Sequence, residues 1–156
     1  VFIGGGNTFK LLKMLKDTDA FANLQDYINN NGLVMGGSAG ALIFGKSIDT
    51  CLKNDLNINS TDENIVNLKD TSGFNAINGY SLFVHYKKKT EQLPQTQEYV
   101  KRLLKSGYKL ICLPEETSLW INDNKISVVG QKPAEMFKSG AVKVLQPTKD
   151  NIIIEK

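Results

Sequence analysis

The sequence is poor in cysteine, with only Cys51 and Cys112 among 156 residues. Because they lie far apart and form no C-x-x-C motif, they support neither a disulfide framework nor a zinc site. We therefore expect no metal and a reduced, cytoplasmic setting. Long apolar runs are also absent: none approaches the roughly 18 residues that span a bilayer, and no charged-then-apolar leader precedes the first predicted element. These absences predict an unanchored protein without a membrane partner.

The sequence also lacks a large excess of charge of either sign. The net charge is +3, and charged residues make up 22% of the chain. The one dense basic run, residues 87–89, is more typical of a solvated loop than of a nucleic-acid patch, so nucleic acid is not an expected partner. With 41% hydrophobic residues, the composition is that of a globular protein large enough for one core. We predict a single domain over residues 1–156.

The most informative stretch begins with a short apolar run. Residues 33–35 predict a buried strand, and residues 36–40 (Gly-Gly-Ser-Ala-Gly) follow it at once. These five residues match G-x-S-x-G, the nucleophile elbow, in which a strained strand-to-helix turn exposes a serine, here Ser38. Small neighbours let the turn close and let a substrate carbonyl approach the backbone. The same residues also suit a phosphate-binding or tight β–α turn, and the pattern alone does not decide between these.

Apolar periodicity predicts alternating strands and helices in the first half of the chain. The predicted elements are strand 1–3, turn 4–7, helix 8–15, helix 19–30 and strand 33–35. This order indicates an α/β fold, with a mostly parallel sheet and helices on both of its faces. Since the first strand begins abruptly at Val1, we expect further strands ahead of it. Residues 1–156 would then form about the C-terminal two-thirds of a longer domain.

The second half of the chain is expected to begin with a long polar excursion. Residues 46–72 are rich in Asn, Asp, Lys and Thr and show little periodicity. A loop of this length is typically functional, here as a wall of a substrate cleft. The strands near the end are short and indicate a β-rich C-terminal portion. The predicted elements are strand 80–84, helix 94–106, strand 108–113 and short strands at 119–121, 126–129, 142–145 and 152–154.

His85 is the only histidine in the chain, so it is the only conventional general base for a serine nucleophile at Ser38. It follows a predicted strand, as Ser38 does, and catalytic groups gather at the carboxyl ends of strands in an open α/β sheet. Glu115 and Glu116 follow another predicted strand, and either could orient the imidazole as the acid of a triad. The alternatives are a partly buried histidine bonded to the backbone and a solvated acidic turn.

Four short segments together resemble the serine peptidase family of dipeptidase E (alpha-aspartyl dipeptidase) and cyanophycinase. They are Gly-Gly-Gly-Asn-Thr-Phe at 4–9, Gly-Gly-Ser-Ala-Gly-Ala at 36–41, Gly-Phe-Asn-Ala-Ile-Asn at 73–78 leading to His85, and Leu-Pro-Glu at 113–115. The resemblance covers nearly the whole chain, and the first two segments are specific as a pair. It implies a fold related to class I glutamine amidotransferases, a flavodoxin-like three-layer sandwich with serine in place of the elbow cysteine. Members carry βα units ahead of the strand that leads into the glycines, in agreement with the strands expected ahead of residue 1.

The resemblance also implies a mechanism. The triad maps onto Ser38, His85 and Glu115, the acid that directly follows Leu-Pro. Backbone N–H groups of Ala39 and Gly6 would hold the oxyanion. The implied reaction is the hydrolysis of a short peptide through an acyl-enzyme, and it requires neither a metal nor an organic cofactor.

Substrate contacts are expected at Asn7, Gly37 and Gln97. The resemblance implies that members cleaving aspartyl dipeptides carry an arginine after a threonine, and Thr96-Gln97 is the closest match here. Because glutamine cannot pair with a carboxylate as a guanidinium does, we expect little preference for an N-terminal aspartate. Residues 87–89 could instead supply positive charge near the cleft.

Two rival interpretations stay open. The first is an esterase or amidase that acts on a small molecule through the same acyl-transfer site. The second is a catalytically inactive fragment or binding module. The sequence also leaves a homo-oligomer open.

Overall fold

The computed structural model describes residues 1–56, 58, 60–86, 93–122, 125–138 and 140–147, together with the backbone of residues 151–153. The basic run at 87–89 lies outside the described residues, and so does residue 154, the last of the predicted strand 152–154. None of the described helices is long and apolar enough to cross a membrane.

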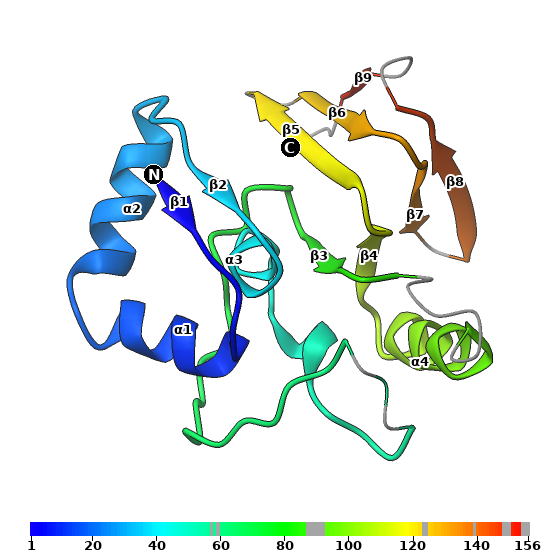
Figure 1. Cartoon of the computed structure of the whole chain (residues 1–156), viewed down its shortest axis with the longest axis horizontal. Helices are drawn as coiled ribbons and strands as arrows, with labels where there is room; N and C mark the ends of the chain where they lie inside the picture. Colours follow the sequence, from blue (N-terminus) through cyan, green and yellow to red (C-terminus); the bar gives the residue numbers. More distant parts are fainter. Residues whose placement is uncertain are drawn as a thin grey trace.

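The first half of the chain forms a two-stranded parallel sheet with two helices between its strands. Strand β1 (Phe2–Ile3) pairs with β2 (Met35–Gly36), and helices α1 (Thr8–Lys16) and α2 (Ala20–Asn29) connect them. These elements lie together on one side of the molecule, with the short helix α3 (Ala39–Leu42) between them and the remaining strands (Figure 1). The predicted helices at 8–15 and 19–30 are confirmed.

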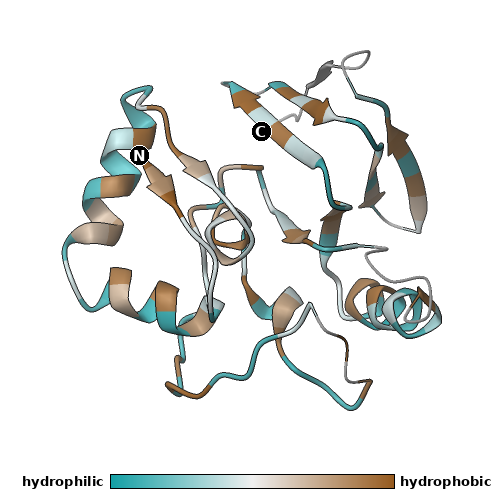
Figure 2. Cartoon of the chain, viewed as in Figure 1, coloured by the Kyte–Doolittle hydropathy of each residue, from teal (hydrophilic) through white to brown (hydrophobic). Residues whose placement is uncertain are grey.

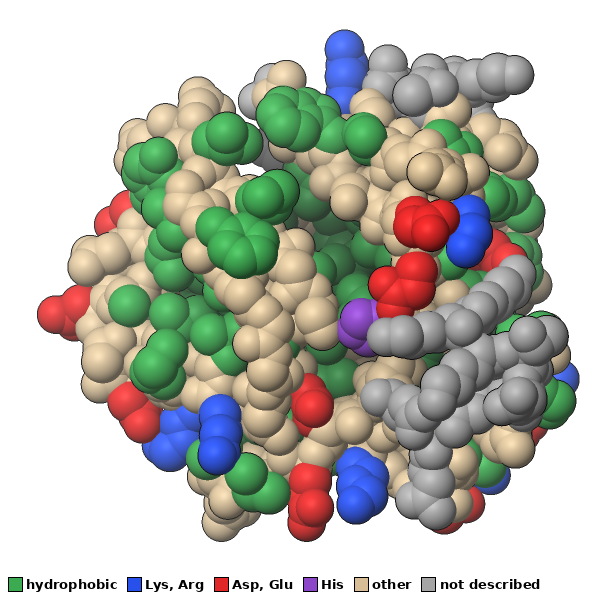
Figure 3. All heavy atoms as spheres, in the orientation of Figure 1, with side chains coloured by type: hydrophobic (Ala, Val, Ile, Leu, Met, Phe, Trp, Pro, Cys, Tyr) green, Lys and Arg blue, Asp and Glu red, His purple; other side chains and the backbone are tan. Residues whose placement is uncertain are grey.

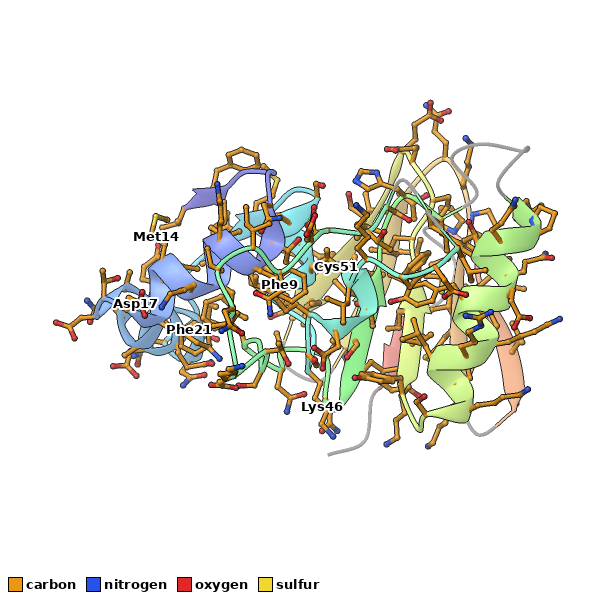
Figure 4. All side chains as sticks on the ribbon, turned by 90° about the horizontal axis from the view of Figure 1, so that it is seen from below. Phe9, Met14, Asp17, Phe21, Lys46 and Cys51 are labelled. Atoms are coloured by element: carbon orange, nitrogen blue, oxygen red, sulfur yellow. The ribbon has the colours of Figure 1, made fainter. Side chains whose placement is uncertain are left out.

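The apolar residues of α1 recur on one helical face, as the periodicity predicts. The side chains of Phe9, Leu12 and Leu15 are buried in the larger of two hydrophobic cores. Figure 4 shows Phe9 and Cys51 near the middle of the molecule, whereas Met14 and Asp17 lie toward its α1–α2 end. The inner face of α1 is therefore anchored to the core close to the segment that contains Cys51.

The centre of the second half is a pair of parallel strands. Strands β3 (Tyr80–Phe83) and β4 (Lys109–Cys112) pair in register from Tyr80 with Lys109 to Phe83 with Cys112. The helix α4 (Leu93–Lys105) connects them and contributes its apolar side chains to the smaller core. All of β3 and most of β4 are buried, as is typical of parallel strands covered on both faces.

The C-terminal portion is rich in strands, as predicted, and their pairings are antiparallel. Strands β7 (Ala134–Lys138) and β8 (Ala141–Leu145) extend the sheet of β3 and β4 in the order β3-β4-β7-β8. Strands β5 (Thr117–Asn122), β6 (Lys125–Gly130) and β9 (Asn151–Ile153) form a separate three-stranded sheet. Along β5, half-buried and exposed residues alternate, and Figure 2 shows bands of apolar and polar colour on the same strand.

The sheets differ from the expectation in two ways. The described strands form three sheets instead of one mostly parallel sheet, and four of their six pairings are antiparallel. Parallel pairing requires a crossover of about a dozen residues, whereas only two residues separate β5 from β6 and β7 from β8. Strand β7 was not predicted at all. Its sequence, Ala-Glu-Met-Phe-Lys, has no β-branched residue, and its pairing with β4 decides its conformation.

The polar excursion at residues 46–72 runs through the lower part of the molecule in the view of Figure 1. A short 3₁₀ helix, η1 (Asp49–Cys51), and two isolated bridges, Ser47 with Ser72 and Leu52 with Asp62, order its described part. Thr50 in η1 is buried, and its Oγ1 donates to the carbonyl oxygen of Leu82 in β3. The excursion is therefore attached to the core strand that precedes the single histidine.

Candidate active site

Ser38 lies in a strained turn between β2 and α3. Its φ of 52° and ψ of −114° are unusual for a residue with a side chain, and such a conformation costs on the order of 1–3 kcal/mol. The turn closes because its neighbours are glycines. A methyl group on Gly36 would collide with the carbonyl oxygen of Gly40, and one on Gly40 would collide with the carbonyl oxygen of Ile3. The strained serine and its close-packed glycines are the local geometry of a nucleophile elbow.

His85 is brought to Ser38 by an extension of the β3–β4 pairing. Past the ends of these strands, Leu113 N–H donates to Phe83 at 2.8 Å, and Tyr86 N–H donates to Leu113 at 2.9 Å. His85 itself adopts a φ of 57°. Its Nε2 lies 2.9 Å from Ser38 Oγ. Two residues 47 positions apart are thus in direct hydrogen-bond contact.

The other ring nitrogen of His85 faces a carboxylate. His85 Nδ1 lies 2.7 Å from Glu115 Oε1. Because an ionised carboxylate can only accept hydrogen bonds, Nδ1 carries the proton and Nε2 is left to accept the hydroxyl proton of Ser38. The three side chains form the continuous hydrogen-bonded arrangement Ser38–His85–Glu115.

Glu116 occupies a different place. Its φ of 64° turns the chain, and its Oε2 lies 3.8 Å from Lys132 Nζ on the surface. Its carbonyl oxygen accepts from Gln131 N–H at 3.0 Å. Of the two glutamates that the sequence left open, Glu115 is therefore the one at the imidazole.

Residues 4–7, here named the glycine loop, lie against Ser38. A methyl group on Gly5 would lie 3.2 Å from Ser38 Cβ and 3.7 Å from Ser38 Oγ, so the loop backbone almost touches the serine. Gly6 has a φ of 137°, which residues with a side chain rarely adopt. Ala39 follows Ser38, begins α3 and is buried. The structure thus brings the glycine loop and the start of α3 to the same serine.

The residues expected to contact substrate are not equally close to Ser38. Gly37 precedes Ser38, and its N–H donates to Ile3 at 3.0 Å. The Asn7 side chain is engaged within the protein, since its Oδ1 accepts from Lys10 N–H and its Nδ2 donates to the Glu63 carbonyl oxygen. Gln97 lies exposed on α4, and none of the described hydrogen bonds joins it to Ser38, His85 or Glu115. The substrate contacts stay predictions.

Figure 3 shows a hollow in this face of the molecule. Apolar side chains form its floor, and the single histidine lies on its wall beside acidic side chains. Among the described residues, no group of three or more His, Cys, Asp or Glu side chains is placed to hold a metal ion. The site brings a serine, a histidine and a glutamate together beside an apolar surface.

The two cysteines are separate from this arrangement. Both are free and buried. The pKa of the Cys51 thiol is raised to about 12, and burial of the thiol is the largest of several causes. A thiol that stays protonated is a poor nucleophile.

Sequence reasoning missed one polar contact close to the site. Asp62, in the polar excursion, accepts hydrogen bonds from both the backbone N–H and the hydroxyl of Thr8 at the start of α1. No periodicity or motif marks Asp62 in the sequence, because the partners are 54 residues apart.

Known proteins resemble this chain over most of its length. The sequence profile of peptidase family S51 matches residues 1–129. Peptidase E of Shewanella denitrificans is 31% identical over 144 residues, which cover 88% of this chain and 56% of that protein. Peptidase E of Escherichia coli O1:K1 is 29% identical over 150 residues, which cover 90% of this chain and 59% of that protein. The chain therefore spans less than two-thirds of the length of these relatives.

Two crystal structures resemble the fold. A protein from Listeria monocytogenes EGD-e, described as peptidase E, superposes with a TM-score of 0.67 at 26% identity, over 84% of this chain and 59% of that one. A peptidase from an acI-B1 Actinobacterium superposes with a TM-score of 0.70 at 21% identity, over 98% of this chain and 58% of that one. The mixed α/β arrangement is thus shared with known structures.

Proposed function

The chain belongs to peptidase family S51, and from this premise we propose that it is a serine peptidase that hydrolyses short peptides through Ser38, His85 and Glu115. The observation that carries the proposal is the continuous hydrogen bonding from Glu115 through His85 to Ser38, at 2.7 and 2.9 Å. A serine in a strained turn, a base within hydrogen-bond reach and an acid orienting that base are the parts that nucleophilic acyl transfer requires.

In the proposed reaction, His85 Nε2 takes the hydroxyl proton of Ser38 while Oγ forms a bond to the peptide carbonyl carbon. Glu115 stabilises the imidazolium that results. The carbonyl oxygen becomes an oxyanion, which accepts hydrogen bonds from the N–H groups of Ala39 and Gly6. His85 then gives its proton to the departing amine as the C–N bond breaks. Water, activated by the same histidine, releases the acyl group from Ser38.

The proposed substrate class is short peptides without a strong requirement for an N-terminal aspartate. No guanidinium stands at position 97, where Gln97 is exposed on α4. A glutamine amide lacks the charge and the paired donors that bind a carboxylate tightly. The test is a panel of dipeptides with matched C-terminal residues. A preference for aspartyl peptides of a hundredfold or more would contradict this part of the proposal.

Several finer expectations stay predictions. They are the three-layer sandwich related to class I glutamine amidotransferases, further strands ahead of residue 1, a cytoplasmic location and a homo-oligomer. None of them enters the mechanism, which uses only side chains and backbone groups of the described residues.

The experiment that tests the proposal is labelling of Ser38 with a serine-directed fluorophosphonate. The protein, Ser38→Ala and His85→Ala would be treated in parallel and read by intact mass and peptide mapping, with circular dichroism as a check of folding. We expect one label at Ser38 in the wild type, none in Ser38→Ala and strongly slowed labelling in His85→Ala. A folded wild type that takes no label would refute a serine nucleophile, and equal labelling of His85→Ala would refute the base.

A labelled wild type then needs a substrate. Peptide turnover that Ser38→Ala abolishes would support the peptidase assignment. Turnover of simple esters or amides alone, again dependent on Ser38, would instead identify a small-molecule hydrolase.

A further inference from the structure

Asp62 connects the polar excursion to the beginning of α1. Its Oδ2 accepts from Thr8 N–H at 2.9 Å and from Thr8 Oγ1 at 2.6 Å. The Thr8 side chain is fully buried, so its hydroxyl relies on protein partners and not on bulk water. Thr8 follows directly after the glycine loop. One carboxylate oxygen therefore fixes the position at which that loop ends.

The backbone of Asp62 is itself held firmly. Its N–H donates to the carbonyl oxygen of Cys51, and its carbonyl oxygen accepts from Lys53 N–H at 2.8 Å. Cys51 ends η1, which is buried against β3 through the hydrogen bond from Thr50 to Leu82. Asp62 thus connects the start of α1 to η1, which is itself bonded to the core strand β3.

Two further contacts complete the restraint of the glycine loop. At its end, Asn7 Nδ2 donates to the Glu63 carbonyl oxygen at 2.9 Å, next to the bond from Thr8 to Asp62. At its beginning, Gly37 N–H donates to Ile3 at 3.0 Å. Between these anchors lie three consecutive glycines, the residue type with the greatest backbone freedom. Without restraint at both ends, such a segment would sample many conformations.

We propose that Asp62 is a positioning residue for the oxyanion hole: by holding Thr8, it keeps the glycine loop against Ser38 so that Gly6 N–H points at the developing oxyanion. The inference rests on the proposed function, because it assumes that Gly6 donates to the oxyanion. Asp62 acts through the loop and not through the imidazole, since both nitrogens of His85 are engaged by Ser38 and Glu115. Oxyanion donors stabilise the transition state only when they are held in place beforehand.

In this positioning role, Asp62 needs an oxygen that accepts hydrogen bonds from Thr8 but does not need its negative charge. Asparagine can place its carbonyl oxygen where Asp62 Oδ2 lies and can accept both bonds from Thr8. Alanine removes both. If Asp62 acted instead through its negative charge on His85, both substitutions would lower activity equally.

The test compares Asp62→Ala, Asp62→Asn and the control Asp70→Ala. Asp70 belongs to the same excursion but pairs with Lys16, at the other end of α1. For the best peptide substrate, we expect Asp62→Ala to lower kcat about 10- to 100-fold with KM changed less than about threefold. Affinity for a peptide aldehyde, which forms an oxyanion on Ser38, should weaken by the same factor as kcat. Asp62→Asn should recover to within about fivefold of the wild type, and Asp70→Ala should match it.

The outcomes separate this inference from the proposed function. A wild type without Ser38-dependent turnover would overturn the proposed function. With an active wild type, unchanged kcat in a folded Asp62→Ala would overturn the inference alone. Equal losses in Asp62→Ala and Asp62→Asn, with an altered pH profile of kcat/KM, would also overturn it and indicate a role for the charge. If Asp62→Ala does not fold, Thr8→Val removes only the 2.6 Å bond; a smaller loss of kcat supports positioning, and no loss refutes it.

Discussion

Replacing Glu115 by alanine tests how much the proposed acid contributes to catalysis. The substitution removes the 2.7 Å hydrogen bond from His85 Nδ1 to Glu115 Oε1. In the ground state this bond orients the imidazole. In the proposed reaction the imidazole becomes positively charged, and the carboxylate would then stabilise it electrostatically. The loss should therefore fall mainly on kcat.

The size of the effect follows from the geometry and exposure. A hydrogen bond to a charged group contributes about 1.5–3 kcal/mol, and an opposite charge near the protein surface adds on the order of 1–4 kcal/mol. The His85 and Glu115 side chains are 27% and 40% exposed, so water screens part of the charge interaction and favours the lower values. A total of about 3–4 kcal/mol corresponds to roughly a 10²- to 10³-fold fall in kcat/KM.

The assay is peptide turnover by Glu115→Ala beside Glu116→Ala, with thermal unfolding of both variants. Glu116 is a matched control because it is the neighbouring acid, and its surface contact with Lys132 spans 3.8 Å. We expect Glu116→Ala to retain activity within about twofold, since exposed ion pairs contribute little. The reasoning would be refuted if Glu115→Ala kept more than a third of wild-type activity, or if Glu116→Ala lost more activity than Glu115→Ala.

Three other predictions follow from the geometry. Gly5→Ala places a methyl group 3.2 Å from Ser38 Cβ, so fluorophosphonate labelling of Ser38 should slow at least tenfold, and labelling at the wild-type rate would contradict the close approach. Burial raises the pKa of Tyr99 to about 12, so its stabilising contribution, complete below the usual pKa near 10, should be lost as pH rises from 10 to 12. In urea unfolding, the free energy of unfolding of Tyr99→Phe should fall less steeply between pH 10 and 12 than that of the wild type. An identical fall in both proteins would exclude Tyr99 as a cause. Cys51, with a pKa raised to about 12 by burial, should resist iodoacetamide at pH 8 until urea unfolds the protein, and rapid native alkylation would disprove its burial.

The elements that the sequence predicts correctly are those with a strong local signal. Helix α1 shows apolar residues at helical spacing, and the turn at Ser38 contains the small residues that its geometry demands. Strands β3 and β4 are apolar runs long enough to indicate burial on both faces. Such features depend on residues within a few positions of one another, so a single sequence suffices to find them.

The predictions that failed concern pairing between distant segments. Strand β7 becomes a strand because it pairs with β4, and antiparallel neighbours replace the expected mostly parallel sheet. Register and direction of pairing depend on how the whole chain packs, and short strands carry little information about either.

By itself, the sequence determined the candidate nucleophile and the candidate base, because one serine lies in a G-x-S-x-G turn and only one histidine is present. The residues themselves left Glu115 and Glu116 open, the family resemblance favoured Glu115, and only the tertiary structure shows which glutamate lies at that histidine. The backbone turns at Glu116, directing its side chain to Lys132 and leaving Glu115 at the imidazole. The contact from Asp62 to Thr8 likewise arises only on folding, since a polar loop without periodicity does not reveal its distant partners. Hydrogen-bond geometry is fixed over distances of about 3 Å, and tertiary packing brings residues that are far apart in the chain within that distance.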